Sequence, residues 1–230
     1  MEAIILAGGL GTRLRSVVAD LPKAMAPVNG KPFLAYLLDG LIGAGFDRAI
    51  LAVGYMSDKV QGHFGHRYRS LPLRYSVETE PLGTGGAIKL AMTLASASTV
   101  LVANGDTYVE LGYGAMFAEH EQAQSRLTIA AQTVSEAGRY GALDIEAGHI
   151  RGFIEKGRPG PGSINAGVYL LSRELLDRYS LPPAFSFETD LLVPHVKEIA
   201  PLAFHTHGIF IDIGIPEDYA RAQTLFPRLA

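Results

Sequence analysis

Cysteine is absent from this chain of 230 residues. A disulfide framework, a thiolate nucleophile and a cysteine-ligated zinc site are therefore excluded, and the composition fits a reducing compartment. No basic segment followed by an apolar one opens the chain, because glycines follow Leu6 almost at once, so we expect no signal peptide. No apolar stretch approaches the ~18 residues that a membrane span requires. These absences favour a cytoplasmic protein that makes no contact with a membrane.

The sequence also lacks a large excess of charge of either sign. Charged residues make up 19% of the chain, the formal net charge is -3 and the isoelectric point is near 6.2. This balance gives no support for nucleic acid or an acidic membrane surface as a partner. Apolar residues are abundant, at 48% of the chain, and there are 26 glycines. This composition suits a globular α/β enzyme with many loops and a substantial core.

An apolar segment near the N-terminus leads into a glycine-rich loop, Gly8-Gly-Leu-Gly-Thr-Arg-Leu14. Glycine leaves the backbone amide groups uncovered, so a polyanion can approach the main chain closely. Arg13 adds a planar fork of donors, and Lys23 in the following Pro-Lys pair adds a compact positive charge. The combination predicts a site for the phosphates of a nucleotide.

Two common phosphate-binding loops do not fit this segment. The Walker pattern is absent, because no Gly-Lys pair is followed by Ser or Thr at the required spacing. The dinucleotide pattern fits only in part, since Gly9 and Gly11 match but Leu14 stands where the third glycine belongs. A plain tight turn after a buried strand is the simpler alternative, and Arg13 with Lys23 argues against it.

The spacing of apolar residues predicts an α/β fold. Strands are expected at residues 3–6, 48–53, 73–77, 99–103 and 127–133, and helices at 33–42, 57–64, 85–95 and 113–121. Strands that alternate with helices imply βαβ crossovers, hence a largely parallel sheet covered on both faces.

The alternation of strands and helices ends at about residue 138. Strands at 142–145, 150–154 and 164–171 follow one another closely and indicate an antiparallel insertion, and helices at 187–199 and 216–225 flank strands at 202–205 and 210–213. We therefore predict one domain over residues 1–230. It is a Rossmann-like, three-layer α/β/α fold with a mainly parallel mixed sheet and a small β-rich insertion at about 138–171.

Two aspartates follow or end predicted strands. In an open parallel sheet, ligands bind beyond the carboxyl ends of the strands, and Asp106 and Asp212 lie at such positions. Carboxylate oxygens suit Mg²⁺, which often takes one or two of them beside phosphates and water. An Asn-Gly-Asp turn is the alternative for Asp106. Asp212 stands between two isoleucines, where a partly buried charge needs a partner or a metal.

The β-rich part carries polar residues of a different kind. Glu155 and Asn165 offer groups suited to sugar hydroxyls, and Lys156 suits a phosphate monoester. Each of these residues alone is more often a solvated residue at a strand end. Their joint occurrence, with Gly141 upstream, predicts a site for a phosphorylated sugar.

Taken in order, the motifs resemble a known family. The matching segments are Gly8-Gly-Leu-Gly-Thr-Arg-Leu14, Pro22-Lys23, Glu80-Pro-Leu-Gly-Thr-Gly-Gly86, Gly105-Asp106, Glu155-Lys156, Asn165-Ala-Gly167 and Asp212-Ile-Gly214. They resemble the sugar-1-phosphate nucleotidyltransferases, and the resemblance runs from Met1 to about residue 225. Within the family the chain is most similar to the D-glycero-α-D-manno-heptose 1-phosphate guanylyltransferases of bacterial surface-polysaccharide synthesis. We expect no C-terminal left-handed β-helix of the kind some relatives carry.

The resemblance implies a reaction in which a sugar 1-phosphate and an NTP, here GTP, give an NDP-sugar and pyrophosphate with the help of Mg²⁺. The nucleophile is already anionic, so the reaction needs alignment and charge neutralisation rather than a general base. The implied nucleotide residues are Leu6, Ala7, Gly8, Gly9, Gly11, Thr12, Arg13, Lys23, Glu78, Gly83 and Asp106. Arg13, Lys23 and Asp106 are the implied catalytic residues, and Asp106 with Asp212 the implied Mg²⁺ ligands. The implied sugar-phosphate residues are Gly141, Glu155, Lys156, Asn165 and Asp212.

The resemblance places Glu78 against the edge of the base. A carboxylate can accept both N1–H and the N2 amino group of guanine, so Glu78 favours GTP. Glu80 or the backbone is the alternative reader of the base.

Other functions stay open at this point. Mannose 1-phosphate with GTP, or N-acetylmuramate 1-phosphate with UTP, would use the same fold. A catalytically silent nucleotide-sugar-binding regulator and a nicotinamide dehydrogenase belong to other classes. A homo-oligomer is compatible with the sequence.

Overall fold

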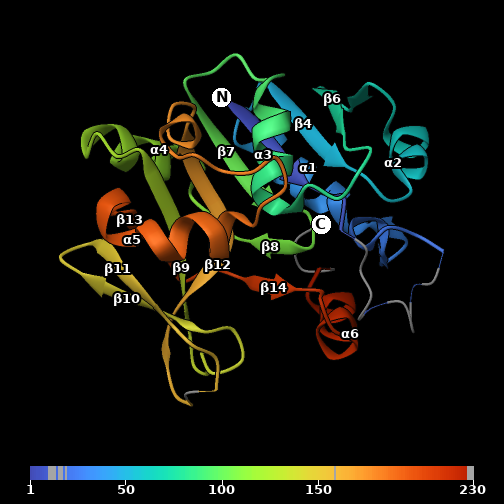
Figure 1. Ribbon diagram of the computed structural model, residues 1–230. Coiled ribbons are helices and arrows are strands. Elements are labelled where there is room, and N and C mark those ends of the chain that lie inside the picture. Colours follow the sequence, from blue (N-terminus) through green and yellow to red (C-terminus); the bar gives the residue numbers. More distant parts are fainter. Residues whose placement is uncertain (10–13, 15–17, 19, 158, 227–230) are drawn as a thin grey trace.

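The computed structural model describes residues 1–9, 14, 18, 20–157 and 159–226 (Figure 1). The strands are β1 (Glu2–Leu6), β2 (Pro27–Val28), β3 (Lys31–Pro32), β4 (Arg48–Val53), β5 (Arg67–Tyr68), β6 (Leu71–Val77), β7 (Thr99–Asn104), β8 (Thr107–Val109), β9 (Leu127–Val134), β10 (Ala142–Glu146), β11 (His149–Ile154), β12 (Gly162–Ser172), β13 (Leu202–Thr206) and β14 (Phe210–Asp212). The helices are α1 (Phe33–Gly43), α2 (Ser57–Phe64), α3 (Gly83–Met92), α4 (Tyr113–Gln122), α5 (Val193–Ile199) and α6 (Pro216–Leu225), with short 3₁₀ turns η1 (Lys23–Met25) and η2 (Leu176–Arg178) and a π-helix η3 (Phe187–Leu192).

A mixed sheet of ten strands runs through the molecule in the order β10-β11-β13-β9-β12-β7-β1-β4-β6-β5. Strands β7, β1, β4 and β6 are parallel neighbours, and β9 and β13 form another parallel pair. The predicted α/β fold with a mixed sheet is confirmed. Because the carboxyl ends of β1, β4, β6 and β7 meet at one edge, residues that follow these strands come together.

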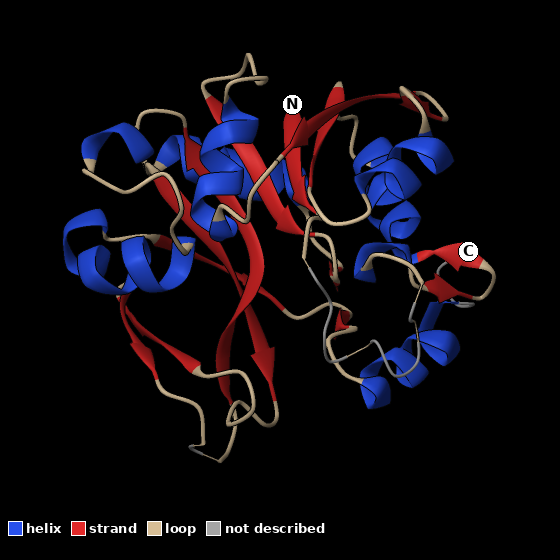
Figure 2. Cartoon of the chain, turned by 45° about the vertical axis from the view of Figure 1, so that its right-hand side comes forward, coloured by secondary structure: helices blue, strands red, loops and turns tan. Residues whose placement is uncertain are grey.

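Helices cover both faces of the sheet (Figure 2). One core cluster joins one face to side chains of α1, α2, α4 and α6, and the other joins the opposite face to α3, η3 and α5. Strand β1 shows why its sequence is apolar throughout, because Ile4 and Ile5 point into opposite clusters and are both fully buried. Burying such a side chain contributes about 1.5–3 kcal/mol.

Strand β12 differs from the sequence-based expectation. The pattern places this segment in an antiparallel insertion, whereas β12 lies in the middle of the sheet, antiparallel to both β7 and β9. The sheet is therefore only partly parallel. The β10–β11 hairpin lies at the edge, and Figure 1 shows it projecting away from the helical layers together with one end of β9 and β12. Apolar periodicity reports that a strand is buried, not which strands it pairs with.

The pattern of apolar residues does not predict several short elements. Strands of two or three residues, such as β8 and β2, are too short to show a period of two. The segment expected as one helix at 187–199 is a π-helix, η3, followed by α5. Among the described residues, no helix has the length and apolar character that crossing a membrane would demand.

Candidate functional site

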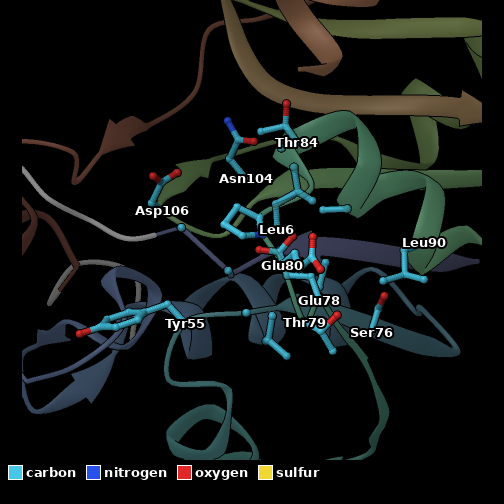
Figure 3. A pocket seen from close by; sticks show the side chains of 18 residues that line it. Leu6, Tyr55, Ser76, Glu78, Thr79, Glu80, Thr84, Leu90, Asn104 and Asp106 are labelled. Carbon is cyan, nitrogen blue, oxygen red and sulfur yellow. The ribbon is translucent and has the colours of Figure 1, made fainter. Parts of the chain in front are cut away.

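A cavity of about 620 Å³ opens at the carboxyl ends of the parallel strands. It lies between these strand ends and α3, which contributes residues from Gly83 to Leu90 (Figure 3). Figure 3 shows Asn104 and Asp106 on one side of the view, Ser76 and Leu90 on the other, and Glu78 and Glu80 between them. Its lining residues are Leu6, Gly8, Gly9, Ala52, Val53, Gly54, Tyr55, Ser76, Glu78, Thr79, Glu80, Pro81, Gly83, Thr84, Ala87, Leu90, Asn104 and Asp106.

The side chain of Glu78 lies directly over the loop that follows β4. A Cβ atom at Gly54 would be 2.5 Å from Oε1 of Glu78, so only glycine leaves room for the carboxylate there. The backbone N–H of Glu78 donates to the carbonyl of Val53 at 2.9 Å, and Oε2 accepts from the N–H of Leu82 at 3.2 Å. These contacts fix the orientation of an acidic side chain inside the cavity.

The glycines of the Gly-Thr-Gly-Gly motif bring α3 close to a distant loop. Gly83 has a φ of +69°, and a Cβ atom there would be 2.5 Å from the carbonyl oxygen of Phe185. A Cβ atom at Gly85 would overlap the ring of Phe185. Three backbone hydrogen bonds join the segments. The carbonyl of Phe185 accepts from the N–H groups of Gly85 at 2.9 Å and Gly86 at 3.4 Å, and the N–H of Phe185 donates to the carbonyl of Leu82 at 2.9 Å. The motif therefore holds the wall of the cavity, and Gly83 also lines it.

A lysine and two aspartates meet beside the cavity. Nζ of Lys23 lies 2.5 Å from Oδ2 of Asp106 and 3.6 Å from Oδ1 of Asp212. The Lys23 side chain is 13% exposed and the aspartate side chains 34% and 33%, so water reaches the carboxylates more readily than the ammonium group. One positive charge thus neutralises part of two negative ones in a half-buried position.

A small antiparallel pair of strands brings the two aspartates together. Strand β8 begins directly after Asp106, and β14 pairs with it so that Asp212 lies opposite Thr107. The carbonyl of Asp106 also accepts a hydrogen bond of 3.0 Å from the N–H of Ile213. The tertiary fold therefore joins carboxylates that are more than a hundred positions apart in the sequence.

The paired carboxylates form a donor set that fits a hard divalent cation. Mg²⁺ takes few protein carboxylates and completes its octahedron with phosphates and water. In the described part of the chain, no group of three or more His, Cys, Asp or Glu side chains has the arrangement of an all-protein metal cage. Asp106 and Asp212 are thus suited to a cation that arrives with a phosphorylated ligand.

Apart from Asp212, which lies near the lining residue Asp106, the predicted sugar-binding residues are not among those that line the cavity. Gly141 has a φ of +85° and precedes β10, and the exposed residues Glu155 and Lys156 follow β11. Asn165 lies in β12, where its amide donates to the hydroxyl of Tyr169 at 2.9 Å. Asn165 also donates to Oε1 of Glu188 at 3.3 Å.

Most of the residues predicted for the nucleotide gather at one place. Leu6, Gly8, Gly9, Glu78, Gly83 and Asp106 line the cavity, Ala7 is buried behind it, and Lys23 and Asp212 adjoin Asp106. The predictions for Gly11, Thr12 and Arg13 fall outside the described residues. Sequence reasoning missed Gly54, Thr84 and Asn104 as lining residues. Gly54 follows one predicted strand, and Asn104 follows another. The rule that ligands bind beyond the carboxyl ends of parallel strands, applied to every predicted strand, therefore finds both residues.

A cavity at the carboxyl edge of an α/β sheet, bordered by a lysine and two carboxylates, defines a nucleotide-binding α/β protein. The chain belongs to the nucleotidyl transferase family, whose sequence model matches residues 2–227.

Two relatives share nearly the whole length. The D-glycero-α-D-manno-heptose 1-phosphate guanylyltransferase of Aneurinibacillus thermoaerophilus is 44% identical over 223 residues, which is 97% of each chain. The protein of the same name from Campylobacter jejuni is 38% identical over 95% of this chain and 97% of its own. The crystal structure of HddC from Yersinia pseudotuberculosis has a TM-score of 0.87 at 43% identity, over 98% of this chain and 99% of its own. A structure of HddC complexed with GMP-PN matches equally well.

Proposed function

We propose that this protein transfers a guanylyl group from GTP to D-glycero-α-D-manno-heptose 1-phosphate, which gives GDP-heptose and pyrophosphate. Two relatives that carry this activity in their names align with 95% or more of the chain. The observation that carries the proposal is the cavity itself, with an oriented carboxylate inside it and the Lys23–Asp106–Asp212 cluster beside it. The product would supply the synthesis of a bacterial surface polysaccharide.

The two ends of the cavity suit the two ends of a nucleotide. Glu78 offers a carboxylate whose oxygens match the adjacent donors of guanine. Leu90 and Ala87 supply apolar surface on the lining, against which a base can pack. Gly8 and Gly9 also line the cavity, and their uncovered backbone lets phosphates approach the main chain between Glu78 and Asp106.

Charge neutralisation is the main task of the phosphate end. An oxygen of the sugar phosphate attacks the α-phosphorus of GTP, a new P–O bond forms there, and the bond to the bridging oxygen breaks so that pyrophosphate leaves. Lys23 and Arg13 would neutralise the converging phosphates and hold them in line. Asp106 and Asp212 would hold Mg²⁺, which supplies further neutralisation when it is bound with the nucleotide.

The sugar would lie toward the β-rich part of the chain. We assign Lys156 to its phosphate, Gly141 and Glu155 to its ring and Asn165 to the polar wall beside the ring, with Asp212 between the two substrates. We also place the reaction in the cytoplasm, because it consumes GTP.

The test is a matrix of nucleotides against sugar 1-phosphates, scored by pyrophosphate release. GTP, UTP, ATP and dTTP are each combined with the 1-phosphates of D-glycero-α-D-manno-heptose, mannose, N-acetylmuramate and glucose. We expect the highest kcat/KM for GTP with the heptose. If kcat/KM is higher with mannose 1-phosphate, mannose 1-phosphate is the sugar substrate; if it is higher with UTP, UTP is the nucleotide substrate. No pyrophosphate release in any combination would favour a binding protein without this activity.

A further inference from the structure

Two irregular backbone elements meet beside the nucleotide cavity. The pairing of β12 with β9 shifts register between Asn165 and Tyr169, and Gly167 within this bulge has a φ of +70°. Facing the bulge, the π-helix η3 replaces the regular helix that the sequence indicates. Bulges and π-turns interrupt regular pairing, and both occur often next to active sites because they redirect side chains.

The two elements bring Asn165 and Glu188 together. The side-chain amide nitrogen of Asn165 donates to the Tyr169 hydroxyl at 2.9 Å and to Oε1 of Glu188 at 3.3 Å. Its Oδ1 accepts from the N–H of Gly167 at 3.0 Å. An asparagine amide has two N–H donors, and both are engaged within the protein. Asn165 therefore has little capacity left for a ligand.

Glu188 is the member of this group that remains available. Its side chain is exposed, and within the described residues only Oε1 has a hydrogen-bond partner. Burial raises the pKa of the Tyr169 hydroxyl, and the carboxylate of Glu188 raises it further, so the phenol stays protonated near neutral pH. The resulting surface combines an ionised acceptor with neutral hydrogen-bonding groups.

The position of Glu188 is tied to the cavity wall. The N–H of the preceding residue, Phe187, donates to Oγ1 of Thr84 at 2.9 Å, and Thr84 lines the cavity. On the other side, Gly167 packs against the side chain of Asn104, which also lines the cavity. Figure 1 shows the segment before α5 running beside α3. The carboxylate thus stands at the border between the cavity and the β-rich part.

We propose that Glu188 determines specificity for the sugar, with its carboxylate accepting hydrogen bonds from ring hydroxyls of the sugar 1-phosphate, and that Asn165 positions it. This inference rests on the proposed function and names a sugar contact for the same reaction. A carboxylate only accepts hydrogen bonds, and it repels the phosphate of the same ligand. It therefore selects the hydroxyl-bearing side of the sugar and helps to set the direction in which the phosphate points.

The decisive experiment compares Glu188→Gln with Asp190→Asn, a matched loss of charge on the same π-helix. Asp190 accepts from the N–H of Ser186, a bond that an amide oxygen can keep. The measurement uses whichever sugar 1-phosphate the wild type converts fastest. We expect Glu188→Gln to raise KM for the sugar 1-phosphate at least tenfold and KM for GTP less than twofold, because hydrogen bonds to a charged group are lost. Asp190→Asn should leave both KM values within twofold of wild type.

Monodeoxy derivatives of mannose 1-phosphate share the ring configuration of the heptose. They distinguish a direct contact between Glu188 and a sugar hydroxyl from an indirect structural effect of the substitution. Removing the contacted hydroxyl should raise KM for the wild type and have little further effect on Glu188→Gln. In Asn165→Ala, KM for the sugar should rise, and the double variant with Glu188→Gln should be no worse than Glu188→Gln alone. An unchanged KM for the sugar in Glu188→Gln, or equal rises for sugar and GTP, overturns the inference. Failure of the wild type on the heptose with GTP overturns the proposed function instead.

Discussion

The ammonium group of Lys23 lies 2.5 Å from Oδ2 of Asp106, although 83 positions separate the two residues. The same ammonium group is 3.6 Å from Oδ1 of Asp212, so one cation holds two carboxylates at the Asp106 side of the cavity. A lysine in this position keeps the carboxylates close together, and in the proposed reaction it would present positive charge to the incoming phosphates.

Replacing Lys23 by methionine should therefore remove activity without removing the fold. We expect kcat/KM to fall by at least about 100-fold, as for the loss of one group that stabilises developing charge. Lys31→Met is the matched control, because Lys31 also pairs with a partly buried aspartate, Asp39, away from the cavity. Steady-state pyrophosphate release and circular dichroism measure the two effects. A similar loss of activity in both variants would contradict the assignment.

The aspartates should make the reaction depend on a divalent cation. Asp106→Asn and Asp212→Asn should each nearly abolish turnover while the melting temperature changes little, since an amide is a poor ligand for Mg²⁺. Excess chelator should stop the wild type, and added Mg²⁺ should restore it. Full activity in excess chelator would refute the metal assignment.

Glu78→Gln should weaken the preference for guanine. The amide offers a donor where guanine also presents one, so the ratio of kcat/KM for GTP over UTP should fall at least tenfold, from the loss of about 1.5–3 kcal/mol per hydrogen bond to a charged group. Glu80→Gln is the control on the same loop, since Glu80 also lines the cavity. If Glu80→Gln changes the ratio and Glu78→Gln does not, Glu80 reads the base.

Gly85→Ala should destabilise the wall of the cavity. The added methyl group overlaps the ring of Phe185, and overpacking of this kind costs about 1–3 kcal/mol of unfolding free energy. Phe185→Leu in the same chain should recover part of the loss by making room. Gly114→Ala in α4 is the control and should stabilise the protein, because among the described residues no atom outside its own stretch of helix lies within 4 Å of the added Cβ, and alanine favours a helix. Urea unfolding measures all four proteins.

His120 should make the stability depend on pH. Burial lowers the pKa of His120 below its usual value, which is about 6.5. The unfolded chain then binds more protons than the native protein, so the free energy of unfolding should decrease as pH falls from about 7 through the unfolded pKa. His120→Gln, which can keep a hydrogen bond to Thr128, should show a smaller decrease between pH 7 and 5. The exposed His66→Gln should keep the wild-type slope, and an identical slope in His120→Gln would exclude this residue as the cause.

Local patterns in the sequence determined the elements and one edge of the site. An apolar run followed by glycines identified β1 and its loop, and the strand-end rule placed Gly8, Glu78 and Asp106 at one edge because parallel strands share the direction of their carboxyl ends. These signals lie within a few residues of one another, so no knowledge of distant contacts is needed to read them.

Contacts between distant segments were decided only by the tertiary structure. The pairing of β14 with β8 sets Asp212 near Asp106, the Phe185 loop explains the glycines at the start of α3, and the bulge in β12 turns Asn165 toward Glu188. Each of these relationships depends on how two separate elements pack, and apolar periodicity reports burial without naming the partner. The sequence therefore identified the chemical groups of the site, and the packing of strands and loops decided which of them meet.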